Sequence, residues 1–305
     1  VPFRAPASAR RAAGIPESVV AAYVASVNNR RYSDTIRDLT DFGQRNSYTA
    51  GNLSARDYIR DRFAAAGLAA STPQFNVSGS LGSTPGFNVV GVQAGWLHPE
   101  EFIVVGAHHD SLPNPPQASP GAEDNASGTA AVLEMARILS AGQHQRTIVF
   151  VAFAGEEQGL DGSTAYVASL SPAQRGNLVA AITMDMISYS ADAQLDVLLE
   201  TFASVAWLRD ELALAAQDYT TLAVFTSFNP FGSDHMPFLN NGLPGILLIE
   251  NDWDVYPQYH RAGDTPSMLT IPQGAEILRM AVATTARLAN PTSPGAGTNW
   301  TILAD

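Results

Sequence analysis

Cysteine, basic side chains and long apolar runs are scarce or missing in this 305-residue sequence. It has no cysteine, which excludes disulfide bonds and thiolate ligands for zinc. Any metal must therefore be bound by histidine and carboxylate side chains. The 17 basic residues are outnumbered by 29 acidic ones, which leaves a net charge of −12. Such a surface repels a phosphate backbone, so we expect no nucleic-acid partner.

No apolar run approaches the ~20 residues that span a bilayer. The longest candidates are the short stretches Ile148–Ala154 and Ile246–Ile249, so we expect no insertion into a membrane. The chain starts at Val1 without methionine and shows no basic-then-apolar leader. We therefore expect a secreted or periplasmic protein whose export signal has been removed. We also expect it to act as a monomer.

Helical and extended patterns divide the first hundred residues. Apolar residues recur at helical spacing in Ser18–Val27 and Asn52–Leu68, which predicts two helices. Between residues 71 and 95, alternating and β-branched runs are bounded by glycine and proline. This pattern predicts strands or a hairpin.

From Glu101 onward, short apolar runs alternate with helical patterns. The runs are EFIVVGA, TIVFVAFAG, NLVAAITM and LPGILLI, and the helical stretches include Ser127–Gly142 and Gln273–Asn290. This alternation predicts an α/β fold, with a mostly parallel, doubly wound sheet flanked by helices on both faces. Ligands of such sheets bind beyond the carboxyl ends of the strands. The polar residues that follow each run are therefore the candidate site residues.

His108 and Asp110 follow the first of these runs. Residues two apart on an extended segment point to the same side, so the carboxylate can accept the imidazole N–H and orient the other ring nitrogen. The alternative is a hydrogen-bonded surface loop. His109 points the other way, and we interpret it as structural.

Glu156 and Glu157 close the run TIVFVAFAG. Adjacent carboxylates at the end of a buried strand repel each other, which raises one pKa and favours a nearby cation. A solvated surface loop is the alternative explanation. Gly155 and Gly159 flank the pair and allow a tight turn directly after the strand.

Three further candidates lie along the chain. Asp124 is in the loop before the helix at Ser127–Gly142, where helix capping by Asp124 or Asn125 is the alternative. Asp185 lies in an otherwise apolar strand pattern, where an acid is costly unless it is paired or binds a metal. His260 is in the later loop YHRAGDT, and a lone loop histidine usually has no special role.

Taken together, these residues predict a metal site at one edge of the sheet. Two imidazoles and three carboxylates exceed the needs of one tetrahedral zinc, but they suit two ions that share a bridging carboxylate. Glu156 is then a free acid beside the metals. The five predicted ligands are His108, Asp124, Glu157, Asp185 and His260.

The ordered motifs GAHHDS, GAEDNASG, FAGEEQGLDGS, MDMIS, GSDHMPF and YHRAGDT resemble those of the co-catalytic zinc exopeptidases that include secreted bacterial leucyl aminopeptidases. The resemblance covers roughly Phe102 to Thr265. It implies a zinc-exopeptidase-like fold and a single catalytic zinc peptidase domain over residues 1–290. Within that domain we expect a helical part over 1–70 and a core over 86–290, followed by a tail over 291–305.

The resemblance also implies roles for these residues in a zinc-dependent aminopeptidase with two zinc ions per chain and peptide substrates. The implied ligands are His108 and Asp185 for one zinc, Glu157 and His260 for the other, and Asp124 as the bridge. Glu156 matches the general base, Asp110 the acid behind the first histidine, and Tyr259 a residue that helps to stabilise the tetrahedral intermediate.

The motif GSDHMPF and the region after Asp185 carry further expectations. Ser233 and Asp234 are expected to support the ligands, and His235 is expected to be structural. Met186 and Phe238 are expected to line an apolar pocket for the first substrate side chain, or else to belong to the core. Some secreted relatives have a disulfide just before this motif, and this chain has no cysteine, so its pocket loop must be shaped in another way.

Three alternative functions remain open at the level of the sequence. A carboxypeptidase of the same family needs a cation near the metals, and Arg261 directly follows His260. A glutaminyl-cyclase-like transferase uses one zinc, which the complete five-ligand set argues against. A binding module that has lost its catalytic residues is disfavoured because all five ligands and Glu156 are present.

Overall fold

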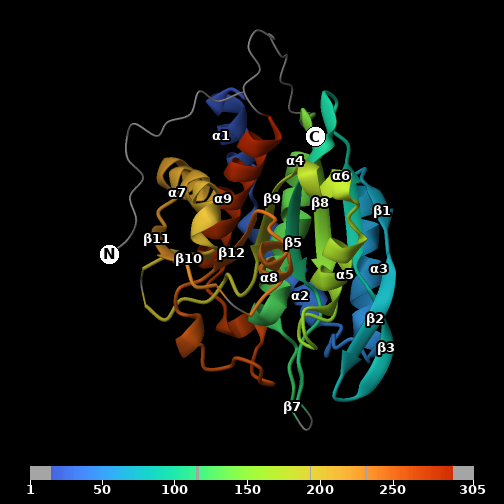
Figure 1. The fold of residues 1–305 in the computed structure, drawn as a ribbon. Helices are drawn as coiled ribbons and strands as arrows, with labels where there is room; N and C mark the ends of the chain where they lie inside the picture. Colours follow the sequence, from blue (N-terminus) through green and yellow to red (C-terminus); the bar gives the residue numbers. More distant parts are fainter. Residues whose placement is uncertain (1–14, 115–116, 193, 231, 291–305) are drawn as a thin grey trace.

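A computed structural model describes residues 15–114, 117–192, 194–230 and 232–290 (Figure 1). The predicted tail over 291–305 and the first 14 residues of the predicted helical part lie outside this range. The main element is an eight-stranded sheet with the strand order β1-β4-β8-β5-β9-β12-β10-β11. Its strands are β1 (Ala69–Ser71), β4 (Val89–Gln93), β5 (His98–His108), β8 (Arg146–Phe153), β9 (Leu178–Met184), β10 (Asp196–Glu200), β11 (Ala223–Ser227) and β12 (Gly245–Ile249).

The centre of this sheet is parallel. Strands β8, β5, β9 and β12 pair in parallel, whereas β4 and β10 run antiparallel to their inner neighbours. The predicted α/β fold with a mostly parallel sheet is therefore confirmed. The carboxyl ends of the four central strands meet at one edge of the sheet, which is the lower edge in Figure 1.

Helices cover both faces of the sheet. Those that pack into the larger core cluster are α1 (Glu17–Ala25), α2 (Asn29–Thr40), α3 (Ala50–Ala65), α4 (Gly128–Leu139), α7 (Ala206–Tyr219) and α9 (Ile271–Ala289). The opposite side carries α5 (Asp161–Ser169), α6 (Pro172–Asn177) and α8 (His235–Asn240). Two small hairpins pair β2 (Gln74–Gly79) with β3 (Gly82–Phe87) and β6 (Pro113–Asn114) with β7 (Gln117–Ala118).

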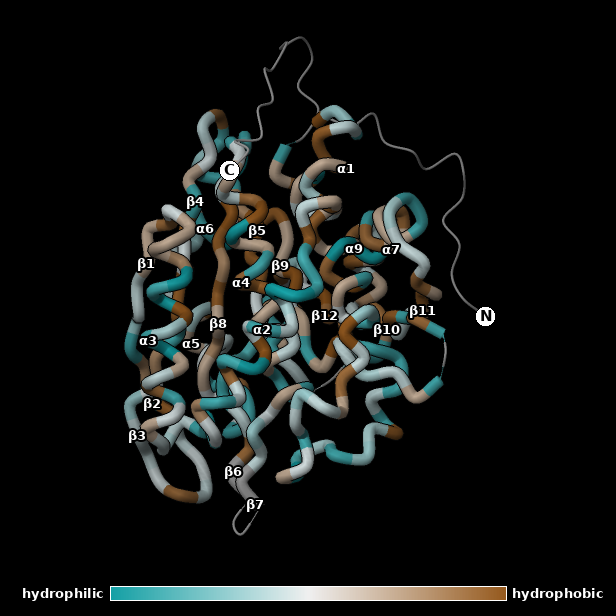
Figure 2. Tube along the Cα trace, turned by 180° about the vertical axis from the view of Figure 1, so that it is seen from behind, coloured by the Kyte–Doolittle hydropathy of each residue, from teal (hydrophilic) through white to brown (hydrophobic). Residues whose placement is uncertain are grey.

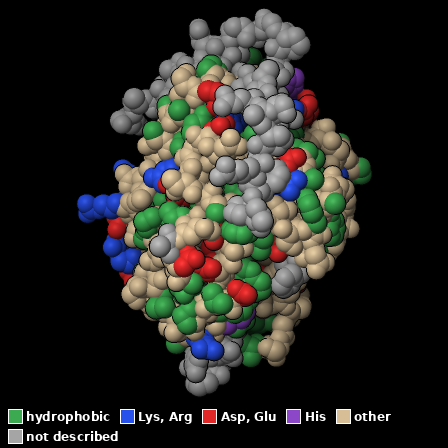
Figure 3. Space-filling model, turned by 90° about the vertical axis from the view of Figure 1, so that its left-hand side faces the viewer, with side chains coloured by type: hydrophobic (Ala, Val, Ile, Leu, Met, Phe, Trp, Pro, Cys, Tyr) green, Lys and Arg blue, Asp and Glu red, His purple; other side chains and the backbone are tan. Residues whose placement is uncertain are grey.

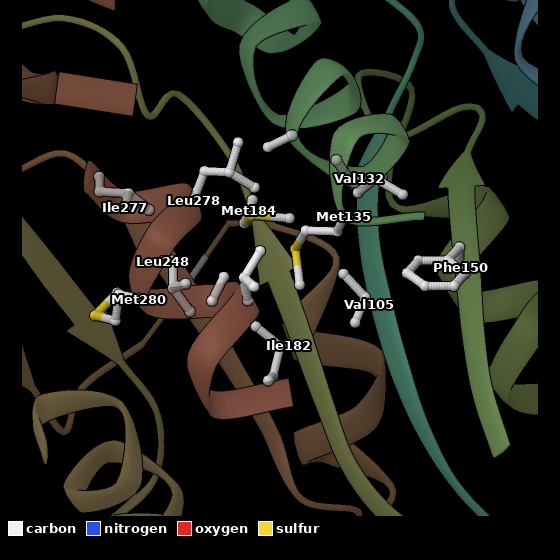
Figure 4. Close-up of a cluster of buried hydrophobic side chains, with 14 of the residues drawn as sticks. Val105, Val132, Met135, Phe150, Ile182, Met184, Leu248, Ile277, Leu278 and Met280 are labelled. Carbon is white, nitrogen blue, oxygen red and sulfur yellow. The ribbon is translucent and has the colours of Figure 1, made fainter. Parts of the chain in front are cut away.

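The alternation of side chains along the strands builds the two halves of the core. In β5, Ile103 and Val105 face the larger cluster, whereas Phe102 and Val104 face the smaller one, because successive strand residues point to opposite faces. Figure 4 shows side chains of α4 and α9 meeting those of β5, β8, β9 and β12 in the larger cluster. In Figure 2 the tube is mostly hydrophobic along the central strands and more hydrophilic over α3.

Helix α2 is an element that the sequence patterns did not predict. Most of its residues are polar, but Tyr32, Ile36 and Leu39 form a buried stripe at helical spacing. The Asn28 side chain caps the helix by accepting a hydrogen bond from the Arg31 N–H at 3.0 Å, which satisfies one free backbone donor. These three apolar residues are too few among the polar ones for a helical pattern to stand out in the sequence.

The described part of the chain contains no helix long and apolar enough to cross a bilayer. On the coloured part of the face shown in Figure 3, acidic and basic side chains are interspersed with apolar ones. The net charge of −12 is therefore not gathered into one patch on this face.

Candidate active site

The candidate ligands come together at the carboxyl edge of the sheet. His108 is the last residue of β5, and Asp185 directly follows β9 instead of lying inside a strand. Glu157 follows β8, and Asp124 lies in the short helical segment η2 (Ala122–Ser127) ahead of α4. His260 lies in the loop after β12, with a left-handed backbone φ of 56°.

One donor set consists of His108, Asp124 and Asp185, which offer ligand atoms within 4.8 Å of one another. The Nε2 atom of His108 lies 3.2 Å from Oδ1 of Asp185 and 3.3 Å from Oδ1 of Asp124. The three side chains expose only 1%, 6% and 12% of their surface, in that order. This set is therefore a buried cluster of one imidazole and two carboxylates.

The second donor set consists of Asp124, Glu157 and His260. The Nε2 atom of His260 lies 3.0 Å from Oδ2 of Asp124 and 3.4 Å from Oε2 of Glu157. The His260 side chain is 31% exposed, so this set is open to solvent on one side. Asp124 belongs to both sets and turns a different carboxylate oxygen toward each histidine.

The electrostatics of the site suit a bound cation. Burial raises the pKa of Glu156 and of Glu157 well above the usual range, and neighbouring carboxylates add to the effect. Burial alone would raise the pKa of Asp124, but hydrogen bonds from His108 and His260 outweigh it and lower the pKa. Among the described residues, Oε1 of Glu157 is buried without a hydrogen-bond partner. A crowded set of nitrogen and oxygen donors of this kind fits zinc.

Three side chains hold the candidate ligands in place. Asp110 accepts hydrogen bonds from the backbone N–H groups of Glu156 and Glu157, both at 3.3 Å, and its Oδ1 lies 3.6 Å from Nδ1 of His108. Ser233 donates its hydroxyl to Oδ2 of Asp185 at 2.7 Å. Asp264 accepts the Asp124 N–H at 3.1 Å. Contacts of this kind orient the side chains that bind a metal.

The sequence model of peptidase family M28 matches residues 88–285. The chain belongs to peptidase family M28. The carboxyl-edge site just described lies within the matched range.

Curated relatives in the family include aminopeptidases and zinc metalloproteases. Aminopeptidase YwaD of Bacillus subtilis is 33% identical over 174 residues, which cover 55% of this chain and 36% of that protein. A probable zinc metalloprotease of Pyrenophora tritici-repentis is 26% identical over 94% of this chain and 81% of its own length. The chain therefore spans about a third of the first of these relatives and most of the second.

Solved structures share the fold. The zinc aminopeptidase BSAP of Bacillus subtilis superposes with a TM-score of 0.75 at 18% identity, covering 87% of this chain and 98% of that one. A glutaminyl cyclase of Fimbriiglobus ruber superposes with a TM-score of 0.71 at 19% identity, covering 86% and 95%. Because this M28 chain resembles both, the fold alone does not separate hydrolysis from cyclisation.

Two histidines of the M28 motifs lie outside the donor sets, as expected. His109 is fully buried, and its Nε2 lies 3.2 Å from the carbonyl of Phe87. Burial lowers its pKa to about 4. His235 is also fully buried, and burial lowers its pKa to about 3. Both rings are therefore neutral parts of the interior near pH 7.

The two residues expected near a substrate pocket differ in their surroundings. Phe238 is fully buried, with its ring against those of Phe153 and Tyr166. The structure therefore favours the core alternative for Phe238. Met186 belongs to a separate apolar cluster with Ile249 and directly follows Asp185, so its pocket role stays a prediction.

Tyr259 lies at the open side of the site. Its ring stacks on that of His260 with the centroids 3.7 Å apart, and the residue is 42% exposed. Burial and the neighbouring carboxylates raise its pKa, so the phenol stays protonated and can donate a hydrogen bond near neutral pH.

Asp264 is a supporting residue to which the sequence patterns gave no role. It is fully buried, and besides the Asp124 N–H it accepts the Glu123 N–H at 2.8 Å and the Tyr256 hydroxyl at 2.7 Å. Burial raises its pKa to about 6. Its place four residues after His260 in YHRAGDT was the available signal, but the backbone groups of Glu123 and Asp124 that it binds lie about 140 positions earlier in the chain.

Proposed function

We propose that this chain is a zinc-dependent aminopeptidase that binds two zinc ions and removes apolar N-terminal residues from peptides. The observation that carries the proposal is the pair of donor sets that share Asp124. His108 and Asp185 would hold one ion, and Glu157 and His260 the other. Two zinc ions held in this way would supply an activated water and would polarise the scissile carbonyl.

Glu156 is the residue we propose as the general base. It belongs to neither donor set, so its carboxylate is available for proton transfer. Its backbone N–H is held by Oδ1 of Asp110, and burial raises its pKa, which strengthens it as a base. Its carboxylate takes a proton from the attacking water and returns it to the nitrogen of the leaving amine.

Tyr259 is the proposed donor to the developing oxyanion. Its phenol is protonated near neutral pH, and its ring is placed by stacking on His260. A fixed donor aimed at developing charge stabilises a transition state. We propose that Met186, next to Asp185, contacts the apolar side chain of the residue that is removed.

The charges around the site favour an aminopeptidase over a carboxypeptidase. Arg261, the cation that kept the carboxypeptidase alternative open, is exposed and donates to the carbonyl of Pro257 at 3.2 Å. The complete pair of donor sets supports hydrolysis over a one-zinc cyclase and over a binding module.

Three leucine peptides of one sequence test this proposal: one with both termini free, one with an acetylated amino terminus and one with an amidated carboxyl terminus. We expect release of leucine from the first and third, no cleavage of the second, and loss of all cleavage after chelation. Cleavage of the acetylated peptide but not of the amidated one would establish a carboxypeptidase. Cleavage of none, together with cyclisation of an N-terminal glutamine, would establish a cyclase.

A further inference from the structure

Arg45 is a fully buried arginine outside the range that the family model matches. It lies between α2 and α3, in a part of the chain to which the sequence patterns gave no role at the site. Its guanidinium donates to the carbonyl of His109 at 2.9 Å and to that of Gly121 at 2.9 Å. It also donates to the carbonyl of Pro120. A single side chain therefore connects two loops that lie far from it in the sequence.

These two loops carry candidate ligands of the metal site. His109 directly follows His108, and Gly121 lies three residues before Asp124. The approach to Gly121 is close, because a Cβ atom there would lie 3.0 Å from Nη2 of Arg45, and its backbone φ is 62°. The guanidinium thus fixes the separation of the backbone segments that place His108 and Asp124.

The backbone of Arg45 is anchored to the same region. Its N–H donates to the Ser111 hydroxyl oxygen at 3.0 Å, and that hydroxyl donates to the carbonyl of Ser119 at 2.9 Å. The Asn52 side chain in α3 donates to the Arg45 carbonyl at 2.8 Å. The Arg45 backbone is therefore tied to the loop after β5 through its N–H and to helix α3 through its carbonyl.

The charge of Arg45 also acts on the site. Burial lowers the pKa of Arg45 to about 10, although Asp264, Asp110 and Asp124 counteract the shift. The guanidinium is therefore charged at neutral pH, while its hydrogen bonds go to backbone carbonyls. Its planar set of donors can reach several carbonyls at once, which an ammonium group on a flexible stem cannot reproduce.

We propose that Arg45 is a positioning residue of the metal centre, which holds the loops of His108 and Asp124 at the spacing that two shared zinc ions require. This inference rests on the proposed function. The N-terminal helices are then part of the zinc site, although they contribute no ligand. A residue with only a structural role would affect folding stability and leave zinc affinity unchanged.

The test compares Arg45→Met and Arg45→Lys with Arg175→Met. Arg175 also donates to two backbone carbonyls, those of Val167 and Leu170, but its partners lie outside the two donor sets. Zinc affinity is measured by competition with a chelator on metal-free protein whose folding is confirmed by circular dichroism. Because loss of a group that orients ligands weakens metal binding about 10- to 100-fold, we expect that loss for Arg45→Met, a smaller one for Arg45→Lys and none for Arg175→Met.

Steady-state kinetics at saturating zinc give a second readout. Arg45 is fully buried and does not reach the substrate, so the Arg45 variants should lower kcat while KM stays within about twofold. Asn52→Ala covers the case in which Arg45→Met does not fold. It removes one contact to the Arg45 backbone and keeps the guanidinium, so we expect a weaker change in the same direction.

Wild-type zinc affinity and kcat in folded Arg45→Lys and Asn52→Ala, with only a lower Tm, would overturn the positioning role. In that case the wild-type protein would still bind zinc and cleave peptides, and the proposed function would stand. Failure of the wild-type protein to bind zinc at all would overturn both.

Discussion

At the scale of single residues, the proposed mechanism assigns metal binding to one group of residues and proton transfer to another residue. The donor sets take up His108, Asp124, Asp185, Glu157 and His260, and they leave out Glu156. The backbone N–H of Glu156 and that of Glu157 are both tied to Asp110. Asp110 therefore positions both Glu156 and Glu157, for which we propose different roles.

Replacing Glu156 by glutamine tests this division. Glu156→Gln keeps the size of the side chain and removes the base, so both zinc ions should remain bound. A general base contributes about 10²- to 10⁴-fold to the rate, and kcat on a free leucine peptide should fall by about that factor. Unchanged turnover at full zinc occupancy would refute the role of Glu156.

Asp124 is predicted to serve both ions. Asp124→Asn should weaken both sites together, because each carboxylate oxygen faces a different histidine. Glu157→Gln is the matched control, since Glu157 belongs to only one donor set and should cost only one zinc. Zinc per chain, determined by elemental analysis after dialysis, distinguishes the two variants. Loss of a single zinc from Asp124→Asn would contradict bridging.

At the scale of elements, the predicted strands and helices reproduce the parts of the fold with strong periodicity. The helix predicted at Gln273–Asn290 is α9 (Ile271–Ala289), and the one predicted at Ser127–Gly142 is α4 (Gly128–Leu139). Helix α2 was missed because its apolar stripe is narrow. The surroundings of Phe238 were not predictable, because the sequence does not reveal which side of the short helix α8 faces the core.

The candidate ligands were predictable because each follows or precedes a strongly patterned element. The contacts that hold them were not, because these contacts join distant segments. Asp264 binds the backbone of Asp124 across 140 positions, and Arg45 binds the carbonyl of His109 across 64. Periodicity carries information about neighbours within an element and none about such pairings.

Helices α4 and α9 are linked by a buried histidine that predicts a pH dependence of stability. His144 lies 2.9 Å from the Leu139 carbonyl through Nε2, and the Asn290 side chain lies 2.8 Å from its Nδ1. Burial lowers the pKa of His144 to about 4. Because the folded-state pKa is depressed, this histidine's contribution is fully present above pH 6.5 and is lost as the pH falls toward 4.

Urea unfolding of metal-free protein at pH 7 and at pH 5 checks this dependence. For wild-type protein the shift of His144 should remove about 2 kcal/mol between the two pH values. In His144→Gln the decrease should be smaller by about that amount. Because the decrease in unfolding free energy is measured within each protein, the destabilisation caused by the substitution itself cancels. Equal decreases in the two proteins would show that His144 does not titrate in this way.

At the scale of the whole molecule, an acidic chain folds into a mostly parallel sheet whose carboxyl edge carries the proposed metal centre. The end of β5, the segments after β8, β9 and β12, and η2 ahead of α4 contribute to the site, and we propose that the region of α2 and α3 supports it through Arg45. Zinc would bind these groups together only in the folded chain, so it should stabilise the fold. Adding a chelator should therefore lower Tm, and restoring zinc should recover it.

The most direct test of the central claim is to add zinc stepwise to metal-free protein while counting bound ions and assaying release of leucine from a free peptide. We predict that binding saturates at two zinc ions per chain and that full activity requires both. Saturation at one ion, or activity that is unchanged in the metal-free protein, would contradict the account.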